Sequence, residues 1–130
     1  MKIAICGSRT RTDRQTITKT IDSLPRESII ISGGCRGVDT WAIEAAKRNG
    51  MKTIEFLPDL AGCSKKHEYA KAYYARNKQI AELCDILFAF VSPKRKGGTE
   101  NTIAYAKKAG KKIFISEPGD TIKIPHTLIL

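Results

Sequence analysis

An apolar run that leads into a glycine-rich turn constrains this fold more than any other part of the sequence. Residues 28–32 are rich in β-branched side chains, three glycines follow at 33, 34 and 37, and a helical pattern begins at Val38. Glycine lets backbone amides come close to an anion, and the start of a helix adds unpaired N–H groups and the positive end of its dipole. This order predicts a βα unit that binds a phosphate-bearing small ligand, with a nucleotide as the first hypothesis. The alternative is a tight turn that requires glycine for its geometry alone.

The rest of the chain repeats the same alternation of strand and helix patterns. The segment Ile86–Val91 is apolar throughout, which is typical of a strand buried on both faces. Alternation at this spacing predicts a parallel sheet with helices on both faces. We therefore expect a Rossmann-like, three-layer α/β/α fold with a mostly parallel sheet of about five strands. Strands are expected at residues 2–6, 28–32, 52–57, 86–91 and 112–116, and helices at about 13–24, 38–49, 66–83 and 99–109.

The length of 130 residues fits one domain over 1–130, and no linker or internal repeat divides it. Residues 116–130 are expected to form a C-terminal tail, whose apolar end Thr127–Leu130 could serve as an edge strand or an oligomer contact. The apolar N-terminal stretch is too short for a signal sequence. No run approaches the roughly 18 apolar residues of a membrane span, so no membrane partner is expected.

The charge balance favours anionic partners. The chain carries 23 Lys and Arg against 13 Asp and Glu, a net charge of +10. These basic residues are spread along the chain, so solvated helix faces and ligand contacts explain them better than nucleic-acid binding, which stays an alternative. The four cysteines include no Cys-x-x-Cys pair, and Cys63 with His67 is the only close Cys/His pair, so no metal is expected. Free thiols indicate a reducing compartment, and hence the cytoplasm.

Three turns rich in glycine, hydroxyl and guanidinium groups follow three of the expected strands. Ligands bind outside the carboxyl ends of the strands in an open parallel sheet, so these turns should meet at one rim. Backbone amides, hydroxyls and guanidinium groups are the donors that phosphate and ribose recognition requires. The preference of these residue types for turns explains each turn by itself, but it explains less well why three such turns occur together. The turns contain Gly7, Ser8 and Arg9; Gly33, Gly34, Cys35, Arg36 and Gly37; and Gly97, Gly98 and Thr99.

Four segments together carry a family resemblance. Residues 2–9, 32–39, 76–80 and 96–102 resemble the motifs of the SLOG superfamily, and most closely those of its small YspA-like branch. Relatives in the superfamily include the LOG phosphoribohydrolases and the Rossmann-like domain of DprA. The resemblance covers about residues 2–116. It implies a Rossmann-like protein that binds nucleotides or nucleotide-derived ligands, as a hydrolase in some members and as a sensor in others, and it implies a homo-oligomer.

The resemblance also implies roles for individual positions. The turn at 33–37 matches the family's first phosphate-binding turn, and Asp39 matches an acidic residue just inside the next helix. Arg76 matches the arginine of an Arg-Asn or Arg-Lys motif, and Asn77 offers an amide to a base edge or a neighbouring backbone group. Taken from the residues alone, Asp39 could accept a hydrogen bond from a ribose hydroxyl or serve equally well as a helix cap. Arg76 could clamp a phosphate, and a surface charge is the alternative. The expected ligand-binding residues are Gly7, Ser8, Arg9, Gly33, Gly34, Cys35, Arg36, Gly37, Asp39, Arg76, Asn77, Gly97, Gly98, Thr99 and Thr102.

One departure from the LOG pattern concerns catalysis. Active LOG hydrolases carry a glutamate after the second glycine turn that assists cleavage of an N-glycosidic bond, and Thr102 takes that position here. A threonine cannot act as a carboxylate base or stabilise an oxocarbenium-like charge. The candidate catalytic residues are therefore Arg76 with Asp39 or Glu100, and whether the chain is an enzyme stays open.

Three functions fit these features. The leading one is a sensor or binding module for a nucleotide or nucleotide-derived ligand, either ADP-ribose-like or a nucleoside phosphate, with no cofactor required. The first alternative is a nucleotide-processing hydrolase of the LOG phosphoribohydrolase type, for which the nucleotide is the substrate. The second alternative is a DprA-like nucleic-acid-binding protein, for which Tyr73 and Tyr74 are the best candidates for base stacking.

Overall fold

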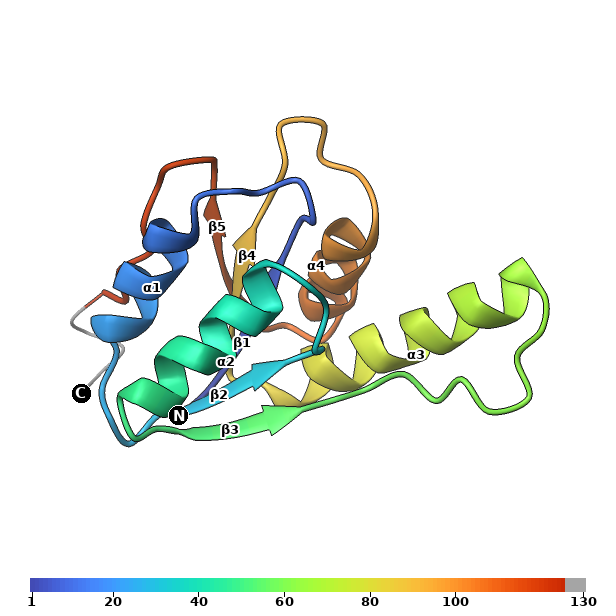
Figure 1. Ribbon diagram of the computed structural model, residues 1–130, viewed down its shortest axis with the longest axis horizontal. Coiled ribbons are helices and arrows are strands. Elements are labelled where there is room, and N and C mark those ends of the chain that lie inside the picture. The colour runs from blue at the N-terminus through green and yellow to red at the C-terminus, as the bar shows by residue number, and fades with distance from the viewer. Residues whose placement is uncertain (126–130) are drawn as a thin grey trace.

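Five parallel strands form the central sheet in the computed structural model, which describes residues 1–125 (Figure 1). Their order across the sheet is β3-β2-β1-β4-β5, so the strand order reverses at β1, which pairs with both β2 and β4. This arrangement confirms the Rossmann-like α/β prediction. The strands are β1 (Lys2–Gly7), β2 (Ile29–Ser32), β3 (Lys52–Glu55), β4 (Ile86–Phe90) and β5 (Lys112–Ser116), and the helices are α1 (Arg14–Asp22), α2 (Val38–Arg48), α3 (Lys66–Leu83) and α4 (Gly98–Lys108).

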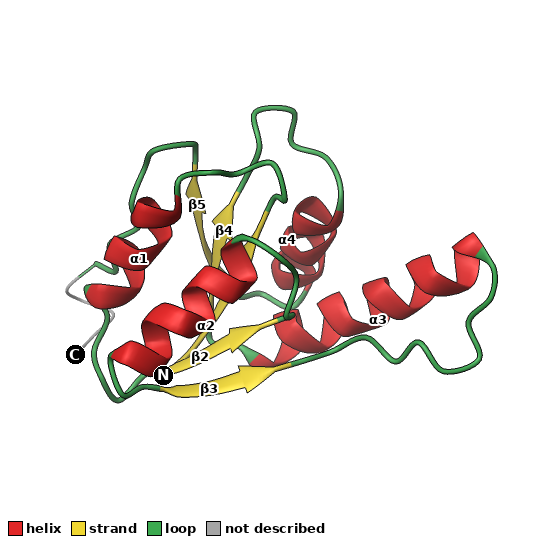
Figure 2. Cartoon of the chain, viewed as in Figure 1, coloured by secondary structure: helices red, strands yellow, loops and turns green. Residues whose placement is uncertain are grey.

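The sheet separates two apolar cores, each covered by a pair of helices (Figure 2). Successive side chains of a strand point to opposite faces, and β1 shows the result. Ile3 and Ile5 join the core under α1 and α2, whereas Ala4 and Cys6 join the core under α3 and α4. All five residues of β4 are buried, as its continuous apolar sequence predicts.

The observed ends of the helices and strands lie close to the predicted ones. The end of β3 shows a physical reason for one of the differences. β3 ends at Glu55 instead of the predicted Leu57 because it lies at the edge of the sheet and its only partner, β2, ends at Ser32. The N–H of Phe56 still donates to the carbonyl of Ser32 at 2.9 Å. Leu57 then leaves the sheet and is largely exposed.

Helix α3 extends beyond the sheet, and its N-terminal part projects from the body of the protein (Figure 1). The start of the helix is fixed locally, since the Glu68 carboxylate accepts hydrogen bonds from the N–H groups of Ser64 (3.2 Å) and Lys65 (2.9 Å). The buried residues of α3 all lie in its C-terminal part: Arg76, Asn77, Ile80 and Ala81. The helix therefore offers a long exposed surface next to the carboxyl ends of the strands. No described helix is both long enough and apolar enough to cross a membrane.

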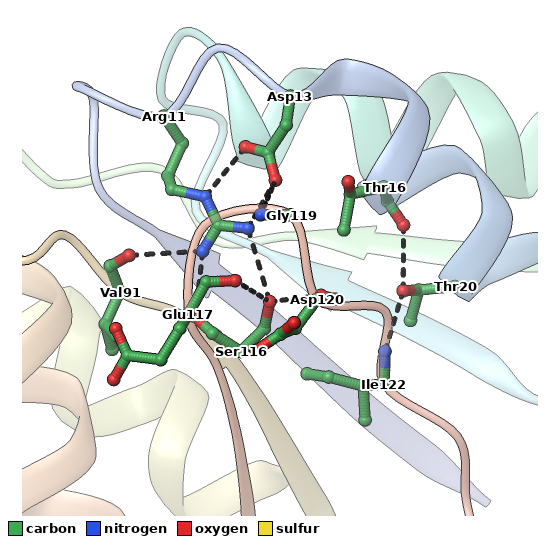
Figure 3. A network of polar contacts seen from close by, with 10 residues as sticks. All are labelled: Arg11, Asp13, Thr16, Thr20, Val91, Ser116, Glu117, Gly119, Asp120 and Ile122. Carbon is green, nitrogen blue, oxygen red and sulfur yellow. Dashed lines mark hydrogen bonds and ion pairs between the residues drawn. The ribbon is translucent and has the colours of Figure 1, made fainter.

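A buried arginine ties the turn after β1 to the ends of β4 and β5 (Figure 3). Arg11 pairs with the Asp13 carboxylate through Nε (2.7 Å) and Nη2 (2.6 Å), and its Nη1 donates to the carbonyls of Val91 (3.1 Å) and Ser116 (2.8 Å). Asp13 also accepts from the N–H of Gly119 at 2.9 Å. Hydrogen bonds from Arg11 and Gly119 hold the pKa of Asp13 well below its usual range. This network stabilises the base of the turn that runs from Gly7 toward α1.

The described part of the tail, residues 117–125, contains no strand. Ile122 is buried in the core under α1, and its N–H donates to Oγ1 of Thr20 at 3.1 Å (Figure 3). The apolar end Thr127–Leu130 lies outside the described residues, so an edge strand or an oligomer contact there stays a prediction.

Candidate ligand-binding site

A cavity of about 410 Å³ opens where β1, β2 and β4 end. The turns after these strands form its floor, the first turns of α2 and α4 border it, and α3 supplies a side wall. This is the rim where the strand order reverses, the place at which open α/β sheets bind ligands. The lining residues are Ile5, Cys6, Gly7, Ser8, Arg9, Thr10, Gly33, Cys35, Asp39, Ala70, Tyr73, Tyr74, Arg76, Asn77, Ile80, Lys96, Gly97, Gly98, Thr99 and Thr102.

The turn after β2 packs directly on the Arg76 side chain. Nη1 of Arg76 donates to the carbonyls of Gly33 (2.5 Å) and Phe56 (3.3 Å), and Nη2 donates to Sγ of Cys35 at 3.5 Å. A Cβ on residue 33 would come within 2.7 Å of Nη1, so the close approach of backbone and guanidinium requires glycine. Arg76 is 6% exposed and is thus no surface charge. It holds the first glycine turn against α3.

Hydrogen-bonded side chains continue from Arg76 to the second glycine turn. Nε of Arg76 donates to Oδ1 of Asn77 at 3.0 Å, and Nδ2 of Asn77 donates to Oδ1 of Asn101 at 3.0 Å. The N–H of Asn101 then donates to the carbonyl of Gly97 at 3.2 Å. Arg76 and Asn77, which the sequence places side by side on α3, therefore fix the two glycine turns relative to each other. Asn101 was missing from the predicted site, because only its position in space reveals this link.

Asp39 lies in the first turn of α2 and is 6% exposed. Its carboxylate accepts a hydrogen bond from the N–H of Cys35 at 3.2 Å. Burial raises the pKa of Asp39 to about 6, although the hydrogen bond from Cys35 and the charge of Arg76 act in the opposite direction. The carboxyl group therefore changes charge in the pH range just below neutral.

The second glycine turn leads into α4 through Gly97, whose φ of 93° lies in the left-handed region that favours glycine. The first turn of α4 carries backbone N–H groups that have no partner within the helix. Thr99 and Thr102 are buried at this helix start, and Oγ1 of Thr102 donates to the carbonyl of Gly98 at 3.0 Å. Thr102 thus supplies a neutral hydroxyl where the LOG pattern has a carboxylate.

Helix α3 gives the cavity an aromatic wall. Tyr73 and Tyr74 line it and remain 36% and 48% exposed, and the guanidinium carbon of Arg76 lies 5.9 Å from the centre of the Tyr73 ring. Ala70 and Ile80 complete this wall and were absent from the predicted site. Their helical spacing from Tyr73 and Asn77 is the sequence signal that could have identified them.

The structure gathers most of the predicted ligand-binding residues around one cavity, but it places four candidates elsewhere. Gly34, Arg36 and Gly37 belong to the first turn without lining the cavity. Glu100 is also outside it, because its carboxylate turns outward and accepts from Nε of Arg95 at 2.8 Å. Asp39 is the one carboxylate among the described lining residues. Arg9, Thr10 and Lys96 line the cavity, and neither Arg9 nor Lys96 forms an ion pair within residues 1–125.

The four cysteines and the one histidine of the described chain form no cluster that could bind a metal. Cys6, Cys35, Cys63 and Cys84 are free thiols, with burial raising the pKa of Cys6 and Cys84. Over residues 1–125 no three His, Cys, Asp or Glu side chains are grouped as metal ligands would be. The polar groups that line the cavity are backbone amides, hydroxyls, two thiols, the side-chain amide of Asn77, cationic side chains and one carboxyl group.

The match to a family model covers the first half of this fold. Residues 1–62 match the YAcAr family, described as the YspA, cpYpsA-related SLOG family, and this segment includes β1, β2, β3 and the first glycine turn. The DNA processing protein DprA of Streptococcus pneumoniae (strain ATCC BAA-255 / R6) is 42% identical over 139 aligned positions, which cover 87% of this chain and 49% of that protein. The chain belongs to the SLOG superfamily. It spans about half the length of this curated relative.

Two solved structures have the same fold as this chain. The crystal structure of S. pneumoniae DprA superimposes on this SLOG chain with a TM-score of 0.74 and 28% identity, over 88% of this chain and 49% of the other. The crystal structure of TM1055, a structural-genomics target, superimposes with a TM-score of 0.62 and 16% identity, over 86% of this chain and 71% of the other. At that identity the likeness concerns the fold alone.

Proposed function

We propose that this SLOG chain binds a nucleotide or nucleotide-derived ligand, ADP-ribose-like or a nucleoside phosphate, as a sensor or binding module. The observation that carries the proposal is the cavity bordered by two glycine turns and two helix starts at the reversal in strand order. The net charge of the chain, +10, also supports the proposal, because it attracts anionic ligands such as nucleotides.

The lining residues divide into regions that suit the parts of a nucleotide. The start of α4 with Gly98 and Thr99, together with Arg9, offers backbone N–H groups, a hydroxyl and a cation for phosphate. The aromatic wall of α3 offers Tyr73 as a surface for a base. Asp39 lines the cavity from the first turn of α2, where its carboxylate can accept a hydrogen bond from a ribose hydroxyl.

Isothermal titration with AMP and with ADP-ribose tests this proposal. Arg9→Ala removes an exposed cavity arginine and should weaken binding of either ligand by about tenfold, since a phosphate loses a charged hydrogen-bond partner. Arg36→Ala is the matched control, because Arg36 is an exposed arginine on the neighbouring turn that does not line the cavity. Absence of binding to both ligands at about 1 mM, or equal losses in the two variants, would contradict the proposal.

N-glycosidic hydrolysis is the second candidate, and Asp39 is the observation that favours it. A carboxyl group with a pKa of about 6 in the cavity is suited to proton transfer near neutral pH. Incubation with AMP followed by chromatography would detect released adenine, and Asp39→Asn should abolish that release. Intact AMP after prolonged incubation with a protein that binds it would assign the chain to sensing.

Nucleic-acid binding is the third candidate, because the relative that matches by sequence is named as a DNA processing protein. It predicts affinity for a single-stranded oligonucleotide that falls steeply with salt, as counterion release requires. Fluorescence anisotropy with a labelled oligothymidylate at two salt concentrations measures this. A homo-oligomer, which the family resemblance implies, is tested separately by light scattering coupled to size-exclusion chromatography.

A further inference from the structure

A second hollow of about 500 Å³ lies along α3 beside the cavity already described. His67, Ala70, Lys71, Tyr74, Ala75 and Tyr105 line it. Ala70 and Tyr74 also line the first cavity, so the two spaces share one wall. The hollow is more open than the cavity and lies on the projecting part of α3 visible in Figure 1.

The cavity and the second hollow lie along one face of α3 and along one face of α4. On α3, residues 67, 70 or 71, 74 and 77 recur at the spacing of one helical face, and that face passes from the second hollow into the cavity. On α4, Thr102 borders the cavity and Tyr105, one turn further along, borders the second hollow. A ligand seated in the cavity can therefore extend between α3 and α4 without leaving a lined surface.

The chemistry of the second hollow suits an anionic and aromatic group. Lys71 is exposed and supplies a cation, His67 supplies an imidazole ring that can form hydrogen bonds, and Tyr74 and Tyr105 supply aromatic rings. No carboxylate lines the hollow in the described chain, and neither Lys71 nor His67 forms an ion pair with a described residue. Tyr74 is 48% exposed between the two spaces, where an aromatic ring gains by stacking.

We propose that this hollow is a second subsite, and that the ligand of this chain is a dinucleotide, two nucleoside units joined through phosphate. One unit occupies the cavity, and the second unit lies over Tyr74 toward Lys71 and Tyr105. This inference rests on the proposed nucleotide binding and adds to it the size and the direction of the ligand. A mononucleotide fills the first subsite and leaves Lys71 and His67 without contact.

Titration of the whole chain with AMP and with diadenosine diphosphate tests the second subsite. The dinucleotide should bind about tenfold more tightly than AMP, because stacking of a second base adds to the affinity. Lys71→Ala should weaken dinucleotide binding by about fivefold and leave AMP binding unchanged. Lys78→Ala is the matched control, since Lys78 is an exposed lysine of the same helix that lines neither space.

The outcomes separate this inference from the proposal on which it rests. Equal affinity for AMP and the dinucleotide, with no effect of Lys71→Ala, would overturn the second subsite and leave nucleotide binding intact. Failure of both ligands to bind would overturn both. Tight binding of an oligothymidylate that depends on Lys71, without any preference for the dinucleotide over AMP, would overturn the dinucleotide and assign the groove to single-stranded nucleic acid. Circular dichroism of each variant, Tyr105→Phe included, checks that the helices stay folded.

Discussion

The guanidinium of Arg76 and the backbone of Gly33 are in direct contact although they lie 43 positions apart in the sequence. Nη1 of Arg76 donates to the Gly33 carbonyl, and the missing Cβ of Gly33 leaves the space that the guanidinium fills. Asn77 and Asn101 extend this contact to the second glycine turn. The two turns that border the cavity thus form one connected unit.

Removal of the Arg76 side chain should destabilise the protein and reduce ligand binding together. Arg76→Ala leaves the buried carbonyl of Gly33 and Oδ1 of Asn77 without the hydrogen bonds that Arg76 donates to them. We expect this loss to lower the free energy of unfolding by about 3 kcal/mol. Arg76→Lys keeps the charge but loses the forked geometry, so it should recover only part of the loss. Urea denaturation measures both variants. An Arg76→Ala protein as stable as Lys78→Ala would show that these contacts contribute little.

A methyl group on residue 33 should act through Arg76. In Gly33→Ala the new Cβ would lie 2.7 Å from Nη1, so the guanidinium must move, at a cost of about 2 kcal/mol. In the Arg76→Ala background that space is empty, and the same substitution should cost much less. Urea denaturation of the four proteins of this double-mutant cycle gives the coupling directly. Equal costs in the two backgrounds would mean that the clash is not with Arg76.

Asp39 should make the stability of the ligand-free protein fall as the pH rises toward neutral. Its pKa is about 6 in the folded chain, above its value near 4 in an unfolded chain, so the folded state holds more protons between about pH 4 and 6. Its contribution to stability is therefore complete below about pH 4 and is lost as the pH rises through about 6. Asp39→Asn should be the more stable protein at pH 7.5, by at most about 3 kcal/mol.

The measurement for Asp39 is the difference in unfolding free energy between wild type and Asp39→Asn at several pH values. Other carboxyl groups contribute equally to both proteins, so the difference isolates Asp39. ADP-ribose, whose pyrophosphate keeps its charge over this range, should also bind the wild type more tightly at pH 5.5 than at pH 7.5, and Asp39→Asn should lose this dependence. A difference that does not change with pH would contradict the raised pKa.

The Arg11 network should control how tightly the tail is held. Arg11→Ala removes the donor to the carbonyls of Val91 and Ser116 and the partner of Asp13, at a cost of about 3 kcal/mol. Hydrogen exchange should then speed up at Gly119, whose N–H bonds to Asp13. Arg14→Ala is the control, because its pair with Glu44 is about half exposed and is worth about 0.5 kcal/mol. Unchanged exchange at Gly119 in Arg11→Ala would contradict this role.

The fold could be predicted from the sequence because its signals are local. Apolar runs such as Ile86–Val91, and glycines after the strands, indicate strand, turn and helix without knowledge of distant residues. The chain order of these elements then fixes a parallel sheet, and with it the rim at which the turns meet.

Much of the site depended on contacts that the sequence does not reveal. The sequence allows Arg76 to be a phosphate clamp or a surface charge, whereas its partners in the structure, Gly33 and Phe56, lie far away in the chain. The outward turn of Glu100 depends on its pair with Arg95 in the preceding loop. The raised pKa of Asp39 depends on its burial, which only the packed structure determines.

An NMR titration of the ¹⁵N-labelled protein with AMP and with ADP-ribose tests the central claim most directly, because it reports both binding and its location. The account predicts that the amide signals of Ser8, Gly33, Gly98 and Thr99 shift together and saturate, while those of Lys47 and Arg48 on the far end of α2 do not move. Spectra that stay unchanged at about 1 mM of either ligand, or shifts that gather away from the cavity, would contradict it.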